Sequence, residues 1–419
     1  MLRTLIRQSA PSSILKPLQI LKEAKDLQLH RPSHMGFWLR DHSRQQSNVK
    51  LVESRLVYQR AMLDWIKNAQ DSVTGGGVPA YYDFSSGWSA AYPETTGYII
   101  TTCIEAGQRL KDPELQQRAQ RMADWELEIQ LPEGAWQGGV VTAPRMPSVF
   151  NTGQIIEGLA SAYLAFGEED YLKAAVKAGR WLVFQQDSDG AWRRHTYNNF
   201  PNTYSTRVSW SLIVVADLAG EPSLRRSAIG YLEWVKQWQH ENDWFDHCTL
   251  ELGDPPLTHT LGYTIEGLIE CGVILNEERW FNMGRRAAEV LLRRFEIRGQ
   301  LAGTYDHNWR GDFSFVCVTG CSQMSRIWSR LFELTDDARY LNAALKMNDY
   351  VLGLINLNSK CLAIRGGVKG SDPVWGPYMR FRIPSWAAKF TLDALFQEGD
   401  GLRRIKGHSR ECDHSLRLS

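Results

Sequence analysis

The chain has 419 residues, of which 43% are hydrophobic and 23% charged, and its 48 Lys and Arg residues nearly balance its 47 Asp and Glu residues. This composition predicts a large globular protein, and the net charge of +1 gives no basis for nucleic acid or an anionic membrane as the main partner. We find no apolar run long enough for a transmembrane helix, and the polar sequence that follows Arg7 argues against a secretory signal. Seven scattered cysteines are typical of reduced thiols, so we expect a cytoplasmic protein.

Residues 1–48 lie outside the repeat pattern that fills most of the chain. Within them, residues 15–27 have the spacing of an amphipathic helix, and residues 30–48 are expected to form a connecting arm. Residues 49–400 are predicted to form one domain. Residues 401–419, which are basic and then polar, are expected to be a flexible tail.

Two kinds of helix alternate in the central domain. The first kind carries Arg, Lys and Gln on one face and begins after acidic or turn residues, so we place it on the outside. The second kind is poorer in charge and richer in Gly, Ala, Ser and Ile, so we place it inside. Outer helices are predicted at 51–69, 112–129, 169–185, 223–238, 277–295 and 337–355. Inner helices are predicted at 94–108, 151–166, 205–219, 258–274, 318–334 and 384–397.

A phrase of Trp, then Gln, then Gly-x-Trp recurs with this alternation. Its first Trp stands at positions 65, 125, 181 and 234, which are intervals of 60, 56 and 53 residues. A repeat of this length, built from two helices, predicts an all-α fold of six hairpins. We expect a closed (α/α)6 toroid, because the alternative, an open solenoid, would expose two apolar ends. The repeated Trp and Gln side chains are predicted to be structural.

The connections from inner to outer helices are short, whereas those from outer to inner helices run for about twenty residues. Long loops without helix are usually functional, and the common polarity of the hairpins places all six of them at one mouth of the ring. The N-termini of the inner helices meet at the same mouth, where their partial positive charge favours anionic groups. The candidate site is therefore predicted at this mouth.

The predicted mouth is aromatic and mixed in charge. Flat aromatic faces beside hydrogen-bonding side chains suit sugar rings, and the excess of Arg suits the carboxylates of uronic acids. The residues expected to bind substrate are Asp83, Trp88, Tyr98, Trp136, Gln154, Arg207, Trp309, Tyr378 and Arg382.

Four residues are candidates for chemistry. Glu94 follows Pro93 at the start of an inner helix and lies among tyrosines, so burial would raise its pKa and suit it to general acid or base catalysis. Asp306 is flanked by aromatic residues in the fifth loop. His259 and Tyr263 are one helical turn apart and can face the same cavity. No set of four ligands has metal-site spacing, so neither a metal nor another cofactor is expected.

The Trp, Gln and Gly-x-Trp phrase resembles the QW repeat of the terpene-cyclase and prenyltransferase superfamily, and the predicted ring is similar to six-hairpin glycosidases. The segments 87–100 and 151–154 resemble bacterial polysaccharide-biosynthesis toroid proteins of the VpsJ type, a resemblance that covers roughly residues 50–400. It implies work on an exopolysaccharide or its precursor. A poly- or oligosaccharide is then the substrate, and a polysaccharide synthesis machinery is an expected partner.

Toroid families of this kind include hydrolases, uronate lyases and glucuronyl C5-epimerases, so the reaction stays open. In a hydrolase, Glu94 and Asp306 would form the pair of carboxylates. In a lyase or epimerase, the C5 proton would be moved by a tyrosine or histidine while an arginine neutralises the uronate. The residues expected in those roles are Tyr98, His259 or Tyr263 for the proton, and Arg207 or Arg382 for the carboxylate.

Two other functions are weighed against an enzyme acting on sugars. A non-catalytic glycan-binding subunit would have the same aromatic mouth but would tolerate the loss of Glu94. An isoprenoid cyclase is disfavoured because the Asp-x-Asp-Asp motif is absent and the mouth is too polar for a hydrocarbon.

Overall fold

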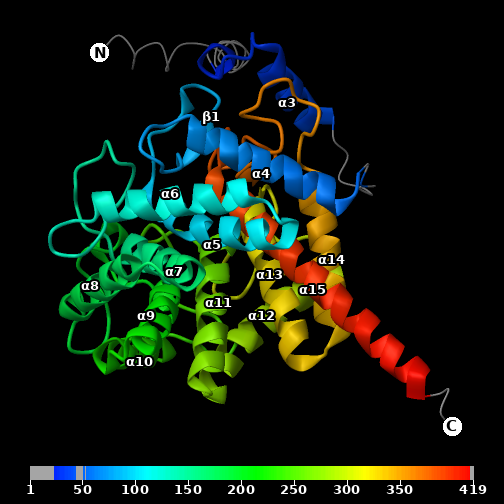
Figure 1. The fold of residues 1–419 in the computed structure, drawn as a ribbon. Coiled ribbons are helices and arrows are strands. Elements are labelled where there is room, and N and C mark those ends of the chain that lie inside the picture. Colours follow the sequence, from blue (N-terminus) through cyan, green and yellow to red (C-terminus); the bar gives the residue numbers. More distant parts are fainter. Residues whose placement is uncertain (1–22, 44–50, 52, 416–419) are drawn as a thin grey trace, which may run out of the picture.

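The computed structural model describes residues 23–43, 51 and 53–415, with side chains described to residue 405. Within these residues, six helical hairpins follow one another around a ring (Figure 1). The outer helices are α4 (Arg55–Asp71), α6 (Pro113–Ile129), α8 (Glu169–Gln185), α10 (Pro222–Lys236), α12 (Glu278–Arg298) and α14 (Ala338–Leu352). The inner helices are α5 (Pro93–Leu110), α7 (Val149–Phe166), α9 (Thr206–Ala219), α11 (Thr258–Leu275), α13 (Val318–Thr335) and α15 (Ser385–Ser415).

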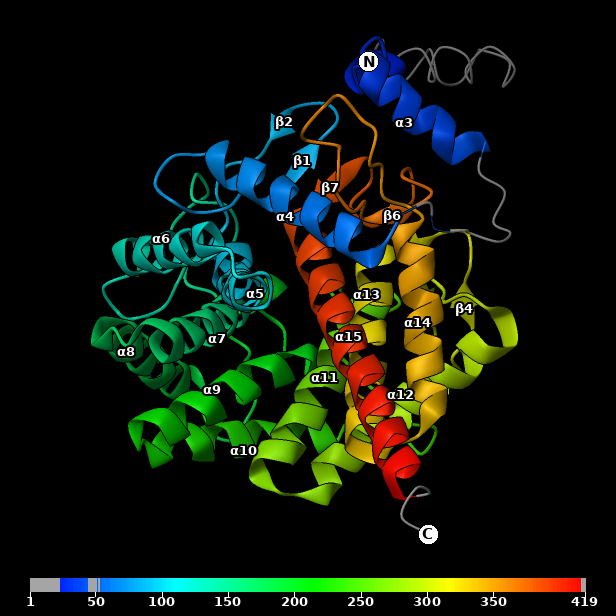
Figure 2. The same ribbon diagram turned by 45° about the vertical axis from the view of Figure 1, so that its right-hand side comes forward.

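The ring is closed. Each inner helix packs against the next, from α5 through α7, α9, α11 and α13 to α15, and α15 packs in turn against α5. Each outer helix packs on the inner helix of its own hairpin or on its neighbours (Figure 2). The all-α (α/α)6 toroid predicted from the repeat is therefore confirmed, and the open solenoid is excluded by the contact between α15 and α5.

The short turns from inner to outer helices share one device. Five inner helices end at a residue in the left-handed conformation, which reverses the chain so that the next outer helix begins two residues later. These residues are Lys111, Gly167, Gly220, Asn276 and Asp336. Asp112 then caps α6 by accepting a hydrogen bond from the backbone N–H of Glu114.

Glycines on the inner helices allow close packing around the ring. A Cβ added at Gly158 of α7 would lie 1.9 Å from the carbonyl oxygen of Gly97 on α5. A side chain at either position would force the two helices apart, so the small residues of the inner family set the diameter of the ring.

The recurring Gln links each outer helix to its own loop and to the next outer helix. Gln130 Nε2 donates to Gly134 O at 2.8 Å and to Ala174 O on α8 at 3.0 Å. Gln186 makes the equivalent pair of bonds to Gly190 O and Ser227 O. The phrase read from the sequence thus holds the outer ring together, as predicted.

The structure differs from the sequence expectation at both ends of the repeat. Residues 32–43, expected to be part of a connecting arm, form helix α3 (Pro32–Ser43), and most of the helix predicted at 15–27 lies outside the described residues. α15 does not end near residue 397 but continues to Ser415, because the glycines at 399 and 401 are accommodated within the helix. No helix of the described segments combines the length and the hydropathy that a membrane span requires.

Helix α3 lies at the same end of the toroid as the short strands of the long loops (Figure 2). Its Asp41 forms an ion pair of 2.5 Å with Lys369, a fully buried lysine that also pairs with Asp372 at 2.7 Å. The backbone N–H of Val374 donates to the same Asp41 carboxylate at 2.8 Å. α3 therefore fixes the sixth long loop in place.

Candidate functional site

The six long loops meet at one mouth and form a closed circle of their own. Backbone hydrogen bonds join the first four pairs of neighbouring loops, from Val141 N to Ala91 O, from Val149 N to His195 O, from Thr203 N to His247 O and from Tyr305 N to Pro256 O. The remaining two pairs are joined through short strands, namely β5 (Val316–Cys317) with β6 (Ser371–Asp372), and β7 (Arg382–Pro384) with β1 (Tyr81–Asp83), which also pairs with β2 (Gly87–Trp88). Strands β3 (Thr304–Tyr305) and β4 (Gly311–Asp312) pair within the fifth loop. The third loop contains the 3-10 turns η1 (Tyr197–Asn199) and η2 (Thr203–Ser205).

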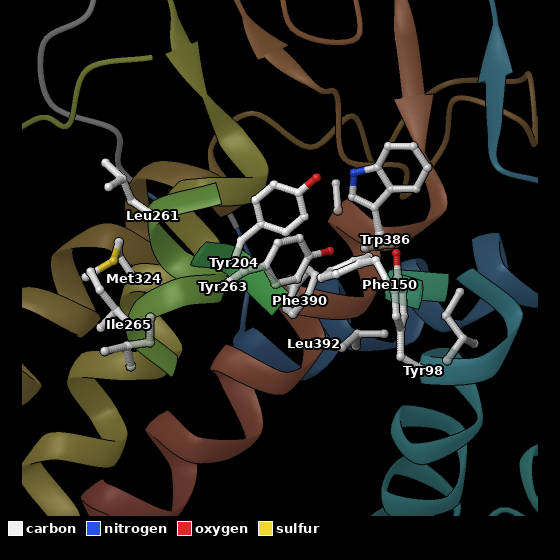
Figure 3. Packing of buried hydrophobic residues seen from close by; sticks show 14 of the residues in the cluster. Tyr98, Phe150, Tyr204, Leu261, Tyr263, Ile265, Met324, Trp386, Phe390 and Leu392 are labelled. Atoms are coloured by element: carbon white, nitrogen blue, oxygen red, sulfur yellow. The ribbon is translucent and has the colours of Figure 1, made fainter. Parts of the chain in front are cut away.

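A cavity of about 580 Å³ lies at this mouth. Its wall is rich in aromatic rings, which are those of Tyr92, Phe150, Tyr197, Tyr204, Tyr263, Tyr378 and Trp386. Figure 3 shows the rings of Phe150, Tyr204, Tyr263 and Trp386 gathered in one place above the side chains of Phe390 and Leu392. Among the described residues that line the cavity, Glu94 is the only carboxylate and none is Lys or Arg.

Glu94 is the second residue of α5 and lines the cavity. The hydroxyl of Tyr92 donates a short hydrogen bond to its Oε2, and Asn151 Nδ2 in turn donates to Tyr92 Oη at 3.4 Å. Burial raises the pKa of Glu94 to about 7, although the Tyr92 hydrogen bond and the positive charge of Arg207 lower it. The carboxyl group can therefore give or take a proton near neutral pH.

His259 is the second residue of α11, and its Nδ1 lies 2.7 Å from Oε1 of Gln323 on α13. Burial lowers the pKa of His259 to about 4, so the imidazole is neutral at neutral pH. A neutral ring carries one proton, and because an amide oxygen only accepts, that proton lies on Nδ1. Gln323 thus leaves Nε2 of His259 with a free lone pair for a ligand.

Two tyrosines stand beside His259. The ring centre of Tyr263 lies 4.4 Å from that of the imidazole, and the ring centre of Tyr378, from the sixth loop, lies 5.5 Å from it. Burial raises the pKa of both phenols well above their ordinary value, so their hydroxyls remain protonated. Acid, base and hydroxyl donors are thus placed around one cavity.

A set of paired charges lies deeper in the ring. The ninth residues of α7, α11, α13 and α15 are Glu157, Glu266, Arg326 and Asp393. At a rise of 1.5 Å per residue they lie about 12 Å along the helices from the mouth. Arg207 reaches Glu157 and Glu266 at 2.5 Å each, and Arg326 also pairs with Glu266. Lys389 pairs with Asp393 at 2.6 Å.

Of the predicted residues, the structure brings Glu94, His259, Tyr263 and Tyr378 together in the cavity wall. Three others are buried elsewhere in the inner ring. Arg207 is fully buried, with its guanidinium bonded to Gln154 as well as to the two glutamates, so the prediction that it neutralises a substrate carboxylate is not supported. Gln154 accepts that bond through Oε1, and Tyr98 is fully buried and packs on Phe390.

Three predicted binding residues, Asp83, Trp88 and Arg382, make structural contacts in the sheet at the mouth. Arg382 Nε donates to Asp83 Oδ2 at 2.7 Å, where the two residues face each other in the pairing of β1 with β7. Trp88 of β2 packs on Trp65 and Tyr82, with ring centres 5.1 and 5.3 Å apart. None of these three predicted residues is part of the cavity wall, because each completes a structural contact instead.

Asp306 does not pair with Glu94. Its Oδ1 accepts hydrogen bonds from the backbone N–H groups of Asn308 and Arg310, at 2.9 and 2.8 Å, so it holds its own turn together and does not line the cavity. Trp309 donates to a backbone carbonyl, that of Asn242, and Trp136 donates to that of Glu126, so both indoles are structural. The carboxylate pair predicted for a hydrolase is therefore absent from the residues that line this cavity.

Sequence reasoning missed two residues that build the site. Phe150 lines the cavity, and Gln323 orients His259 from behind. The position within the inner helices carries a signal, because the second residues of α5, α7, α11 and α15 all line the cavity. Gln323 has no comparable signal, since its role depends on how α13 packs against α11.

The described residues contain no group of three or more His, Cys, Asp or Glu side chains that could hold a metal ion. The six cysteines whose side chains are described are free thiols, five of them buried.

Comparison with protein-family models finds no match to the chain, and no curated protein sequence matches it either. Solved structures with the same fold include an unsaturated glucuronyl hydrolase specific for heparin, with a TM-score of 0.65, 13% identity, and coverage of 82% of this chain and 96% of that chain. A cellobiose 2-epimerase from Bacillus thermoamylovorans B4167 gives a TM-score of 0.63 at 14% identity and covers 82% and 97% of the two chains. A sugar epimerase from a ruminal bacterium gives 0.65 at 13% identity, with the same coverage. The chain therefore shares its (α/α)6 toroid fold with these solved structures.

Proposed function

We propose that this protein is a carbohydrate-active enzyme that moves a proton to or from a carbon atom of a sugar held in the mouth cavity. The observation that carries the proposal is that one aromatic cavity is lined by both a carboxyl group with a pKa of about 7 and a neutral imidazole. Glu94 and His259 are the proton-transfer groups of this proposal.

The cavity wall suits a sugar. Aromatic rings offer flat apolar faces for the C–H surface of a pyranose, and hydroxyl and amide groups between them offer donors and acceptors for its hydroxyls. The described lining supplies such groups from Ser148, Asn151, Thr260 and the tyrosines. Solved structures of the same fold include sugar epimerases and a glucuronyl hydrolase, which supports a saccharide as the substrate class.

A proton transfer at carbon can be written with these residues. Nε2 of the neutral His259 takes the proton of a C–H bond next to a carbonyl, and the electron pair of that bond moves toward the carbonyl oxygen to give an enolate. The hydroxyl of Tyr263 can donate a hydrogen bond to the enolate oxygen, which stabilises the charge as it develops. Donation of the proton of the neutral Glu94 carboxyl group to the other face of that carbon gives an epimer, whereas expulsion of a group on the next carbon, together with that proton, gives an unsaturated product.

A two-carboxylate hydrolase is disfavoured by the same geometry. Retaining and inverting glycosidases use two carboxyl groups on either side of the scissile bond. Glu94 is the only carboxyl group in the described cavity wall, and Asp306 is committed to its own turn.

The biological setting is part of this proposal. Work on an exopolysaccharide or its precursor, with a synthesis machinery as partner, is supported by the sequence resemblance to polysaccharide-biosynthesis toroid proteins. A cytoplasmic location is supported by the free thiols.

The test is incorporation of deuterium from D2O into carbon-bound positions of candidate sugars, followed by NMR and mass spectrometry. Uronate-containing oligosaccharides and neutral disaccharides form the panel. We expect the wild-type protein to label one class of sugar, and we expect Glu94→Gln and His259→Asn to lower the rate of labelling by about 10²- to 10⁴-fold.

Glu126 offers a matched control for Glu94→Gln. It is fully buried in α6, its carboxyl oxygens have no hydrogen-bond partner, and burial raises its pKa well above the ordinary value, but it does not line the cavity. Glu126→Gln should leave the labelling rate unchanged. Saturable sugar binding without any labelling would contradict the proposed chemistry and favour the non-catalytic glycan-binding subunit.

A further inference from the structure

A second hollow adjoins the cavity on its outer side. It has a volume of about 700 Å³ and lies between the second and third long loops and the C-terminal half of α8. Its lining comprises Glu133, Pro147, Lys177, Arg180, Trp181, Phe184, Gln185 and His195, which we call the α8 groove.

The α8 groove borders the cavity, and the two hollows share two lining residues. Pro147 and His195 line both hollows, so they form the rim that a ligand would cross. The ring centre of His195 lies 5.7 Å from that of Trp181, which forms the inner wall of the groove. A chain molecule that leaves the cavity over this rim therefore enters the α8 groove.

The side of α8 that lines the groove carries the groups that such a chain needs, of which only Trp181 is buried. Lys177, Arg180, Trp181 and Phe184 are spaced by three, four and seven residues, which places them along one side of the helix. Phe184 is 77% exposed, so its ring is available as a flat apolar platform.

The charges of the groove differ from those of the cavity. The lining of the groove contains two exposed cationic side chains, Lys177 and Arg180, and one carboxylate, that of Glu133. Arg180 also forms an ion pair with Glu221, which lies outside the groove lining. The described cavity wall, in contrast, contains no Lys or Arg. Cationic groups that could recognise an anionic sugar therefore lie in the α8 groove and not around the reacting sugar.

We propose that the α8 groove binds the continuation of an anionic polysaccharide chain, one sugar of which occupies the cavity. Phe184 stacks on a sugar ring, and Lys177 and Arg180 attract its carboxylate or sulfate groups. This inference rests on the proposed saccharide specificity of the cavity and adds to it a polymeric, anionic substrate.

The experiment compares a disaccharide with a long oligosaccharide of the same repeat, taken from hyaluronan, alginate and polygalacturonate, by isothermal titration calorimetry. The wild-type protein should bind the long form of one of these more tightly than its disaccharide. Phe184→Ala and Lys177→Glu should each reduce this preference by about three- to tenfold. The loss for Lys177→Glu should shrink as salt is added, because salt screens exposed charges.

Matched controls are available on the opposite side of the ring. Ile297, 82% exposed on α12, and Lys346, exposed on α14, allow Ile297→Ala and Lys346→Glu to remove a similar apolar side chain and to reverse a similar charge. These variants should keep the wild-type preference. Equal affinity of the wild type for long and short forms, or an equal loss in the controls, would overturn the inference.

The two proposals can fail separately. If the protein prefers long chains through Phe184 but labels no sugar with deuterium, the proposed binding in the α8 groove is kept and the proposed proton transfer is rejected. Labelling of a disaccharide by a protein that shows no length preference would reject the groove alone. If none of the three saccharides binds in either form, the anionic polymer is rejected as the substrate.

Discussion

The inner ring has two polar levels, and they treat buried charge in opposite ways. At the second helical position, Glu94 and His259 face a cavity, and each has one hydrogen-bond partner from the protein. At the ninth position, the charged side chains of four inner helices are paired with one another or with Arg207 and Lys389. Buried charge that is fully paired holds the ring together, whereas a buried ionisable group with spare bonding capacity is available for chemistry.

The largest effect on stability should come from removing an arginine from the ion pairs at the ninth helical position. Arg207→Ala removes the ion-pair partner of Glu157 and one of the two partners of Glu266, which keeps Arg326, and we expect it to lower the free energy of unfolding by about 3–5 kcal/mol. Urea unfolding followed by circular dichroism measures this. Arg225→Ala, which breaks an exposed ion pair with Asp217, is the control and should cost less than about 1 kcal/mol. Similar losses for the two variants would contradict the distinction between the levels.

The buried ionisable groups at the second helical position should make the free energy of unfolding depend on pH. Because burial raises the pKa of Glu94 from 4.5 to about 7, the folded protein holds a proton that the unfolded chain releases between these pH values. The contribution of Glu94 to the free energy of unfolding should therefore fall by about 3 kcal/mol as pH rises through this window. Burial lowers the pKa of His259 from 6.5 to about 4, so the contribution of His259 rises over much of the same window. The difference between the wild type and Glu94→Gln isolates the Glu94 contribution, and urea unfolding of both proteins at a series of pH values should show this difference fall. An unchanged profile in the variant would mean that Glu94 is not buried as a neutral acid.

A smaller loss of stability is expected when one hydroxyl group is removed at each of the two levels. Thr102 Oγ1 donates to Asp393 Oδ1 at 2.7 Å in the deeper level, and Thr102→Val should cost about 1.5–3 kcal/mol because the acceptor is charged. Thr260, in the cavity wall, donates to the carbonyl of Leu257 at 3.0 Å, and Thr260→Val should cost about 0.5–1.5 kcal/mol. Thermal melting of both variants gives the ratio. A larger loss at Thr260 would reverse the comparison.

The smallest effect is expected at Asp306. Backbone N–H groups hold its carboxylate and keep its pKa below the ordinary value, and the side chain lies away from the cavity. Asp306→Asn should therefore leave deuterium labelling unchanged, in contrast to the loss expected for Glu94→Gln. A loss of labelling in Asp306→Asn as large as that in Glu94→Gln would restore the carboxylate pair.

The fold could be predicted because its signals repeat. Trp, Gln and Gly recur at the same points of successive hairpins, and each copy makes the same local bonds, as Gln130 and Gln186 do. Helix ends were predicted to within a few residues where acidic caps or turn residues mark them. α15 was predicted too short because glycine was taken as a stop signal, although packing against α13 and α14 carries the helix through it.

The candidate site could be predicted only in part. Glu94 and His259 are near the first residues of inner helices, and that position alone brings them to the mouth. Arg207 also stands second in its helix, but its long side chain turns away from the mouth to reach Glu157 and Glu266. A charged residue at the second position can face the cavity or reach down to the ninth residues of the neighbouring helices. The outcome depends on how the helices are aligned with one another, and no single segment of sequence shows that alignment.

The circle of hydrogen bonds between the loops has a consequence for engineering. Each long loop is anchored on both sides, by one neighbour that precedes it and one that follows it. A loop transplanted from another toroid must therefore present two matching edges, while the residues between those edges are free to vary. Substrate specificity in this architecture can be exchanged one long loop at a time, provided that the hydrogen bonds between neighbouring loops are preserved.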